Sequence, residues 1–212
     1  MKFLSLLIMV LFSFEASAMT QQERRKLFDD STEKLKATGI EKGIPKFGQK
    51  FPDISINEKK ISDRLKEGPV LFIVYRGGWC PYCVKQLVEI ENNIEKFKTK
   101  NISIIAVAPE TEMEVLKTKD KNKLSFEVIS DNDGDILRKL GLLFRVDDAV
   151  EAEYRNIGIN LSANQGNDRH ELPVPVTYLI DKNLNIHYGF VDVDYTKRPK
   201  FDDLINAVES LK

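Results

Sequence analysis

The 212-residue sequence has only two cysteines and two histidines, and no excess of charge of either sign. Its 32 basic residues nearly balance 33 acidic residues, so the formal net charge is −1. Such a balance gives no electrostatic case for binding nucleic acid or an anionic membrane surface. Two neighbouring cysteines also exclude a small secreted scaffold held together by many disulfides, which needs cysteines spread along the chain.

Residues 1–18 have the pattern of a secretory signal peptide. Lys2 precedes an apolar stretch from Phe3 to Phe14, and Ala16-Ser17-Ala18 matches an A-x-A cleavage site. The stretch is too short for a membrane-spanning helix, and no later apolar run is long enough for one. An uncleaved anchor or a buried first helix is the alternative. We therefore expect an exported protein without a membrane span after cleavage, periplasmic if the source is a Gram-negative bacterium.

The two cysteines, Cys80 and Cys83, lie between a predicted strand and a predicted helix. Val70 to Tyr75 is apolar without strict alternation, which is typical of a strand buried on both faces of a parallel sheet. From Pro81 to Phe97, apolar residues recur every three or four positions among charged ones, which predicts an amphipathic helix. Pro81 suits the first helical position, where a missing N–H costs nothing. The sequence thus predicts both thiols in the first turn of a helix.

This placement predicts thiol chemistry, because the start of a helix favours an anion. Free N–H groups and the helix dipole should make Cys80 ionise more readily than an ordinary cysteine. Cys83 lies one turn further on, within reach of a disulfide. Arg76 can add positive charge nearby, although the sequence does not give its direction. We predict Cys80 as the nucleophile and Cys83 as the resolving thiol, with Trp79 as a packing and shielding neighbour and Tyr82 tuning redox potential or access.

The rest of the chain predicts an α/β domain. A helical extension at 19–42, with a helix over 20–38, precedes a single domain at 43–212, which opens with a short strand at 53–57 and a short helix at 61–66. Strands are predicted at 102–108, 126–129, 173–180 and 185–191, and helices at 110–119, 133–140 and 199–211. This order favours a parallel core with right-handed crossovers and a final antiparallel strand. Residues 142–171 interrupt the pattern as a partly helical insertion near the site.

Three phrases carry a resemblance to a known family: Tyr75-Arg-Gly-Gly-Trp-Cys-Pro-Tyr-Cys83, Leu172-Pro-Val-Pro175 and Asp192-Val-Asp-Tyr-Thr-Lys-Arg198. From about residue 43 onward, the chain resembles a peroxiredoxin-like branch of the alkyl hydroperoxide reductase/thiol-specific antioxidant (AhpC/TSA) superfamily. The resemblance implies a thioredoxin-like α/β fold, with a central mixed, mostly parallel sheet flanked by helices. It also implies two-cysteine redox chemistry without a bound cofactor.

The same resemblance implies that a cis peptide bond precedes Pro175 and that the backbone at Val174 and Pro175 faces the cysteines, where it can bind an extended thiol or disulfide partner. The sequence departs from the family at two positions. Typical peroxiredoxins place a proline and a threonine seven and three residues before the peroxidatic cysteine, and here these positions hold Ile73 and Gly77. A downstream arginine usually completes the peroxide site. The candidates Arg76, Arg145, Arg155 and Arg169 stay open.

Three functions are compatible with these residues. The first is a thiol peroxidase that uses a Cys80/Cys83 dithiol–disulfide cycle, with a small thiol or a thioredoxin-like protein as reductant. The second is an exported thiol–disulfide oxidoreductase that acts on protein disulfides. The third, more remote, is a module whose two thiolates hold half of a metal site. His170 could approach the cysteines for such a site, whereas His187 is expected to be a packed or surface residue. The oligomeric state stays open.

Two acidic segments resemble ligand sites only in the order of their residues. Asp131-Asn-Asp-Gly134 lacks the later glutamate and the helix pair of a calcium loop, which predicts a turn. Asp192 and Asp194 could form a paired-carboxylate site. Because they follow a strand and belong to one of the family-like phrases, we interpret them instead as part of a loop near the site.

Overall fold

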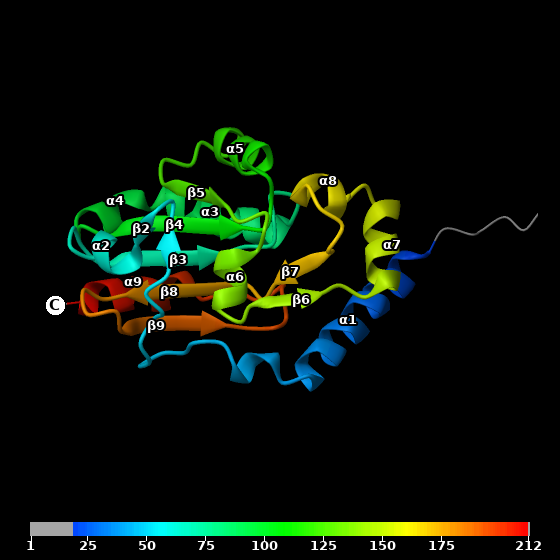
Figure 1. The fold of residues 1–212 in the computed structure, drawn as a ribbon, viewed down its shortest axis with the longest axis horizontal. Helices are drawn as coiled ribbons and strands as arrows, with labels where there is room; N and C mark the ends of the chain where they lie inside the picture. The colour runs from blue at the N-terminus through cyan, green and yellow to red at the C-terminus, as the bar shows by residue number, and fades with distance from the viewer. Residues whose placement is uncertain (1–18, 212) are drawn as a thin grey trace, which may run out of the picture.

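The computed structural model describes residues 19–211, so the predicted signal peptide lies outside the described residues (Figure 1). Its centre is a five-stranded sheet with the order β5-β4-β3-β8-β9. The β3–β4 and β4–β5 pairs are parallel, whereas the β3–β8 and β8–β9 pairs are antiparallel. The predicted mixed sheet is confirmed, but the expectation that it is mostly parallel was wrong, because β8 runs antiparallel to β3 as well as to β9. The strands are β3 (Val70–Val74), β4 (Ser103–Ala108), β5 (Glu127–Ser130), β8 (Val176–Ile180) and β9 (Ile186–Val191).

The strand before the cysteines is buried on both faces, as predicted. Every residue of β3 is buried, because β3 lies in the middle of the sheet. Successive side chains point to opposite faces of a strand. Phe72 therefore belongs to one hydrophobic cluster, while Leu71 and Ile73 belong to another on the opposite face. The continuous apolar run at 70–75 is thus explained by two cores, one on each side of the sheet.

Helices cover both faces of this sheet (Figure 1). Leu87, Phe97, Val115 and Leu204 bring four helices to the core on the Leu71 side, and Ile61 and Leu137 bring two short helices to the other core. The first four are α3 (Pro81–Asn92), α4 (Ile94–Lys98), α5 (Glu112–Lys121) and α9 (Phe201–Ser210), and the other two are α2 (Ile61–Arg64) and α6 (Asp135–Lys139). The expected helices at 61–66, 110–119, 133–140 and 199–211 are therefore present with shifted ends.

The helix predicted from Pro81 to Phe97 is not continuous, so this prediction was wrong in its length. Asn93 leaves the helical conformation, with φ −117° and ψ 20°, between α3 and α4. Its side-chain amide donates to the carbonyl of Glu89 at 2.9 Å. Asparagine competes with the helix backbone for hydrogen bonds in this way. A hydrophobic periodicity alone does not show such a break.

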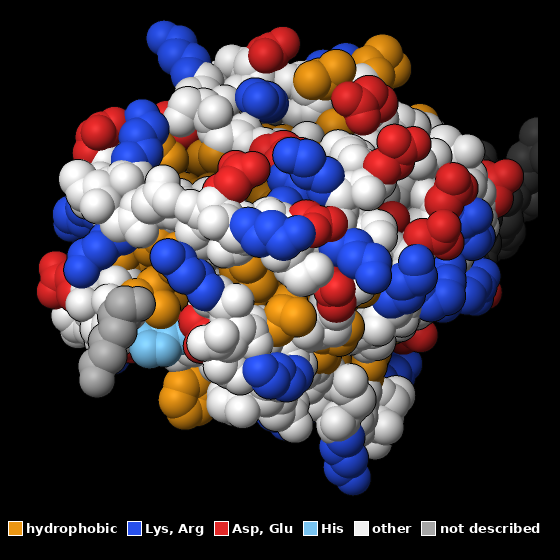
Figure 2. All heavy atoms as spheres, turned by 60° about the vertical axis from the view of Figure 1, so that its left-hand side comes forward, with side chains coloured by type: hydrophobic (Ala, Val, Ile, Leu, Met, Phe, Trp, Pro, Cys, Tyr) orange, Lys and Arg blue, Asp and Glu red, His pale blue; other side chains and the backbone are white. Residues whose placement is uncertain are grey.

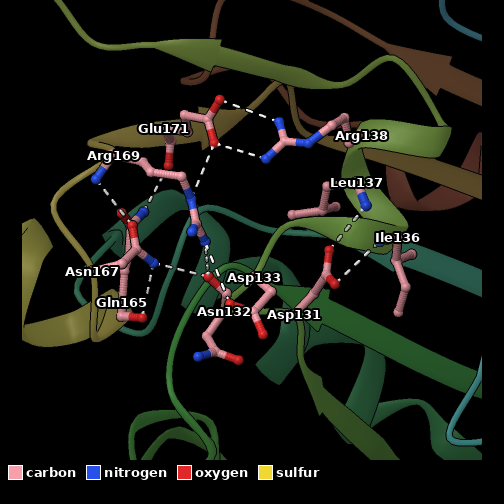
Figure 3. Close-up of polar contacts among 10 residues, drawn as sticks. All are labelled: Asp131, Asn132, Asp133, Ile136, Leu137, Arg138, Gln165, Asn167, Arg169 and Glu171. Atoms are coloured by element: carbon pink, nitrogen blue, oxygen red, sulfur yellow. Dashed lines mark hydrogen bonds and ion pairs between the residues drawn. The ribbon is translucent and has the colours of Figure 1, made fainter.

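The segment at 142–171 is partly helical, as predicted, and begins and ends in short strands that pair with each other. These are β6 (Leu143–Arg145) and β7 (Glu171–Pro173), which enclose α7 (Asp148–Asn156) and α8 (Leu161–Gln165). Glu171 joins this segment to α6, because both of its carboxylate oxygens accept from Arg138, at 3.2 and 3.1 Å (Figure 3). Arg169 also donates to the carbonyl of Asn132 at 2.7 Å.

The turn predicted at Asp131–Gly134 is confirmed. The Asp131 carboxylate accepts from the backbone amides of Ile136 and Leu137, at 3.1 and 2.9 Å (Figure 3). These amides belong to the first turn of α6, where N–H groups have no acceptor within the helix. The carboxylate is therefore used to hold the start of a helix.

The predicted leading helix is present as α1 (Gln21–Ala37), followed by a short 3-10 helix, η1 (Ile40–Lys42). It lies beside α7 (Figure 1), to which Arg24 binds through an ion pair with Glu153. The rings of Phe28 and Tyr154 pack with centroids 5.4 Å apart. The division into an extension and a domain at residue 43 stays a prediction. A small hairpin, β1 (Ser55–Ile56) and β2 (Lys59–Lys60), follows η1.

Charged side chains of both signs are interspersed over the face shown in Figure 2. This mixture agrees with the near-neutral balance of the sequence. Among the helices of the described part of the chain, none is both long enough and apolar enough to cross a lipid bilayer.

Candidate active site

The two cysteines lie where β3 passes into α3. Cys80 is the N-cap residue of α3 and Pro81 occupies its first turn, as predicted. Gly78 allows the loop between them to approach α5 closely, because a Cβ atom at this position would lie 1.9 Å from Oγ1 of Thr118. Only glycine fits there without a shift of the neighbouring helix.

The two sulfur atoms are in contact. Sγ of Cys83 donates to Sγ of Cys80 at a separation of 2.8 Å. Both side chains are buried, with 1% of Cys80 and none of Cys83 exposed. A disulfide between them therefore requires only a small local movement.

The site favours the thiolate form of Cys80. The hydrogen bond from the Cys83 thiol is the largest cause that lowers the pKa of Cys80, to about 6, against the opposing effect of burial. The charge of Arg76, the backbone N–H of Cys83 and the charge of Arg198 contribute further in the same direction. Burial raises the pKa of Cys83, and the hydrogen bond that its thiol donates to Cys80 raises this pKa further. The start of the helix therefore lowers the pKa of Cys80 through one backbone amide, and the hydrogen bond from the Cys83 thiol lowers it more.

Arg76 is a buried cation next to these thiols. Only 4% of it is exposed, and it donates to the hydroxyl of Tyr154. Its guanidinium lies 4.1 Å from the ring centroid of Tyr195 and 5.2 Å from that of Trp79. None of the ion pairs within residues 19–211 gives it a carboxylate partner. Since an unpaired buried charge is costly, the Cys80 thiolate is its natural counter-charge.

The other three arginines considered from the sequence lie elsewhere and are paired with acidic side chains. Arg145 binds Asp148, Arg155 binds Glu151, and Arg169 binds Glu171 and Asp133. Of the four candidates, only Arg76 therefore reaches the thiols.

Sequence analysis missed a second arginine at the site. Nη2 of Arg198 donates to Sγ of Cys83 at 2.8 Å, across 115 positions of the chain. The available signal was the phrase Asp192–Arg198, which we placed near the site without giving its last residue a role. The loop interpretation of Asp192 and Asp194 is thereby supported.

A small cavity lies between this site and α1. Arg76, Pro175 and Tyr195 line it on one side, and Phe28 and Thr32 of α1 on another. Its volume open to a water-sized molecule is about 30 Å³. Since about 10–15 Å³ holds one water molecule, the cavity admits only very small molecules without a movement of α1.

Comparison with known proteins gives the family. A family model described as "AhpC/TSA family" matches residues 40–189, more than half of the chain. The chain belongs to the AhpC/TSA family. The match begins three residues before the domain start predicted from the sequence.

Individual relatives of this AhpC/TSA protein are distant. It is 29% identical over 112 residues to a peroxiredoxin of Nanoarchaeum equitans, covering 45% of this chain and 48% of that protein. It is also 29% identical over 100 residues to the thiol-disulfide oxidoreductase ResA of Bacillus thuringiensis, covering 45% and 58%. The chain thus spans about half the length of the curated relatives it matches.

Solved structures confirm the predicted fold. The structure of peroxidoxin BcpB from Mycobacterium tuberculosis has a TM-score of 0.59 and 14% identity, covering 79% of this chain and 98% of that one. The PrxQ structure from Xylella fastidiosa has a TM-score of 0.58 and 13% identity, covering 77% and 95%. At this level of identity the comparison shows the fold alone, which is the thioredoxin-like fold of peroxiredoxins.

The aromatic residues of the motif lie at the rim of the AhpC/TSA protein's site. Trp79 packs against Tyr154, with ring centroids 5.5 Å apart, in agreement with a packing and shielding role. Tyr82 is 43% exposed, and its ring meets that of Tyr195 edge-on at 6.1 Å. That Tyr82 tunes the redox potential or the access to the site stays a prediction.

The expectation of a cis peptide bond before Pro175 was wrong, because the described residues contain no cis peptide. The chain runs from β7 directly into β8 here, and extended backbone on both sides suits a trans bond. The orientation of the backbone at Val174 and Pro175 toward the cysteines stays a prediction. The side chain of Val174 is fully buried in a core cluster, and its N–H donates to the carbonyl of Leu142 at 2.9 Å. Pro175 lines the cavity beside Arg76.

Glu110 is a buried acid that sequence analysis did not assign to the site. It follows β4 and is 2% exposed, and its Oε2 accepts from the N–H of Gly78 at 2.9 Å. Burial raises the pKa of Glu110 to about 7. Its position directly after a parallel strand next to β3 was the available signal. In the structure it holds the loop that leads to Cys80.

Neither histidine contacts the cysteines. Nε2 of His170 lies 2.8 Å from Oγ of Ser162, and Nε2 of His187 lies 2.8 Å from Oγ of Ser210. Within the part of the chain that the structure describes, no group of three or more His, Cys, Asp or Glu side chains is arranged to hold a metal ion. The approach of His170 to the thiols, which we considered from the sequence, is not found.

The pKa of Cys80 predicts how its alkylation rate depends on pH. With a pKa of about 6, we expect the rate to rise with pH and to level off by about pH 7, where an ordinary cysteine is still largely protonated. In Cys83→Ala the main hydrogen bond to the thiolate is lost, so the rise should move to higher pH. Rates with iodoacetamide, followed by mass spectrometry, measure both profiles. Identical profiles in the two proteins would contradict the role of the Cys83 hydrogen bond.

Proposed function

We propose that this AhpC/TSA protein is a thiol peroxidase that reduces hydrogen peroxide or small organic hydroperoxides. The observation that carries the proposal is a thiolate-favouring Cys80 that is only 1% exposed, beside a buried arginine. A small oxidant can reach such a sulfur through slight local movements, whereas a larger reagent or a protein disulfide reaches it only when the cover over Cys80 opens. The family membership and the two-thiol arrangement support the same activity.

The proposed reaction has three steps. The Cys80 thiolate attacks one peroxide oxygen, the O–O bond breaks, and the other oxygen leaves as hydroxide or alkoxide and takes up a proton. Cys80 is then a sulfenic acid. Cys83 attacks its sulfur, the S–S bond forms, and water leaves. A thiol reductant finally supplies two electrons and two protons and restores the dithiol.

The reductant is proposed to be a small thiol or a thioredoxin-like protein. The sequence pattern of residues 1–18 supports export, with the periplasm as the location if the source is a Gram-negative bacterium. In an oxidising compartment a disulfide persists, so turnover there needs a dedicated reductant.

A second candidate is thiol–disulfide exchange with protein substrates. The direct contact between the two cysteine sulfurs, at 2.8 Å, favours rapid closure of a disulfide after any attack by Cys80. The partial match to a ResA protein points the same way. This activity requires that the cover over Cys80 opens to admit a polypeptide.

Rapid mixing of the reduced protein with hydrogen peroxide tests the first proposal. Trp79 packs close to the site, so its fluorescence should report oxidation. We expect oxidation at least about a hundredfold faster than that of a free thiol at the same pH, since the thiolate, Arg76 and the small cavity act together. Oxidation no faster than that of free cysteine would overturn the peroxidase. Rapid reduction of a disulfide-scrambled protein in the same preparation would then support thiol–disulfide exchange.

A further inference from the structure

Arg198 is held so that its guanidinium faces the second cysteine. Nη2 donates to Sγ of Cys83 at 2.8 Å, while Nη1 donates to the backbone carbonyls of Tyr195 and Lys197, at 2.8 and 2.5 Å. Nε is buried and makes no hydrogen bond. As for Arg76, the ion pairs within residues 19–211 include no carboxylate for Arg198. Among residues 19–211, the sulfur of Cys83 is thus its one contact with a group that can carry a negative charge.

Besides these bonds from Arg198, two aspartates hold the loop that carries the arginine. The Asp192 carboxylate accepts from the N–H of Asp194 at 2.8 Å, and the Asp194 carboxylate accepts from the N–H and the hydroxyl of Thr196, at 3.0 and 2.7 Å. Such aspartate turns stabilise a loop locally. The two aspartates therefore build the loop, and Arg198 projects from it toward Cys83.

The reduced site has one thiolate and two nearby cations, the buried Arg76 and the half-buried Arg198. Cys80 carries the negative charge, and Cys83 keeps its proton and donates it to Cys80. Once Cys80 has reacted, its charge is gone and Cys83 no longer has an anion to donate to. The positive charge of Arg198 then remains in contact with Cys83 alone, which favours ionisation of that thiol. As the reaction proceeds, the negative charge is therefore lost from the Cys80 sulfur, and ionisation of the Cys83 sulfur becomes favourable.

We propose that Arg198 is a catalytic residue for the second step, in which it stabilises Cys83 as a thiolate while Cys83 attacks Cys80. This deepens the function proposed above and rests on the Cys80/Cys83 cycle. In the attack, the Cys83 sulfur forms a bond to the Cys80 sulfur and the bond from Cys80 to its leaving group breaks. The leaving group is hydroxide after peroxide, or a thiolate after a disulfide reagent. The proton lost by Cys83 passes to that leaving group or to water, and Arg198 keeps all of its protons.

An aromatic disulfide, dithiobis(nitrobenzoate), separates the two steps without peroxide. Attack by Cys80 releases one coloured thiolate and leaves a mixed disulfide, and attack by Cys83 on the Cys80 sulfur releases the second. We expect Arg198→Met to slow the second release at least about tenfold and to move its rise to higher pH, since only the thiolate attacks. The first release should fall less than about threefold, because Arg198 is the smallest of the contributions that lower the pKa of Cys80.

Two variants make the result specific. Arg198→Lys keeps the charge and should restore most of the rate of the second release. Lys200→Met removes an exposed cation two positions further on and should leave both releases unchanged. Equal slowing of both releases in Arg198→Met, or an unchanged pH profile of the second, would overturn the assignment. Because the reagent replaces peroxide, failure of the peroxidase proposal leaves this result interpretable.

Discussion

Cys80→Ser should consume no peroxide above the background rate, a loss of about a thousandfold or more. Serine cannot ionise near neutral pH, and it offers no sulfur that peroxide can oxidise. The other thiol cannot replace it, since burial raises the pKa of Cys83 and none of its surface is exposed. Peroxide consumption with a thiol reductant in excess, measured for the wild type and this variant, gives the comparison.

Cys83→Ser is the matched control, because it removes the same atom one helical turn away. We expect Cys80 to be oxidised once in this variant and to stop as a sulfenic acid, which dimedone traps and mass spectrometry detects. Serine can still donate a hydrogen bond to the Cys80 thiolate, so the first oxidation should persist. If Cys83→Ser lost the first oxidation and Cys80→Ser retained it, the assignment of nucleophile and resolving thiol would be reversed.

Those features of the site that arise from neighbouring residues could be predicted from the sequence. The apolar run of β3, the glycines that end it and the periodicity of α3 are local patterns, and together they place Cys80 at a helix start. Spacing alone put Cys83 one turn further on. These patterns also gave the order of strands and helices, because each element repeats its own hydrophobic period.

Contacts between distant segments could not be predicted in the same way. Tyr154 lies on α7, 78 positions from Arg76, and its hydroxyl accepts from that arginine only because the 142–171 segment folds over the end of the sheet. The contact of Arg198 with Cys83 is of the same kind. The sequence shows which residues are arginines, but it does not show that Arg145 pairs with a carboxylate away from the thiols while Arg76 lies beside them. The trans bond before Pro175 likewise follows from the path of β7 into β8.

The charge arrangement also affects the disulfide form. When Cys80 and Cys83 are joined, neither sulfur carries a charge, and both Arg76 and Arg198 remain without an anion. With the pKa of Cys80 at about 6, ionisation at pH 7 favours the dithiol about tenfold over a site with an ordinary thiol. This is about 1.4 kcal/mol, or about 30 mV in reduction potential. The disulfide should therefore be easier to reduce than the disulfide of a site with an ordinary thiol.

Replacing Arg76 with methionine should weaken or remove this preference for the dithiol. After the Cys83 hydrogen bond, Arg76 makes the largest favourable contribution to the low pKa of Cys80, so that pKa should rise in Arg76→Met. Because a higher pKa leaves less Cys80 thiolate near pH 7, peroxide should react about tenfold more slowly. The loss of thiolate also makes the dithiol less favourable, so the reduction potential should become more negative by up to about 30 mV. The Tyr154 hydroxyl also loses its donor, which should lower the free energy of unfolding by about 1–3 kcal/mol.

Arg76→Lys keeps the charge but loses the planar contact with Tyr195, so it should keep the potential and lose part of the stability. Redox titration and denaturant unfolding of both variants separate the two effects, and a potential unchanged in Arg76→Met would mean that the Cys80 thiolate does not depend on this arginine.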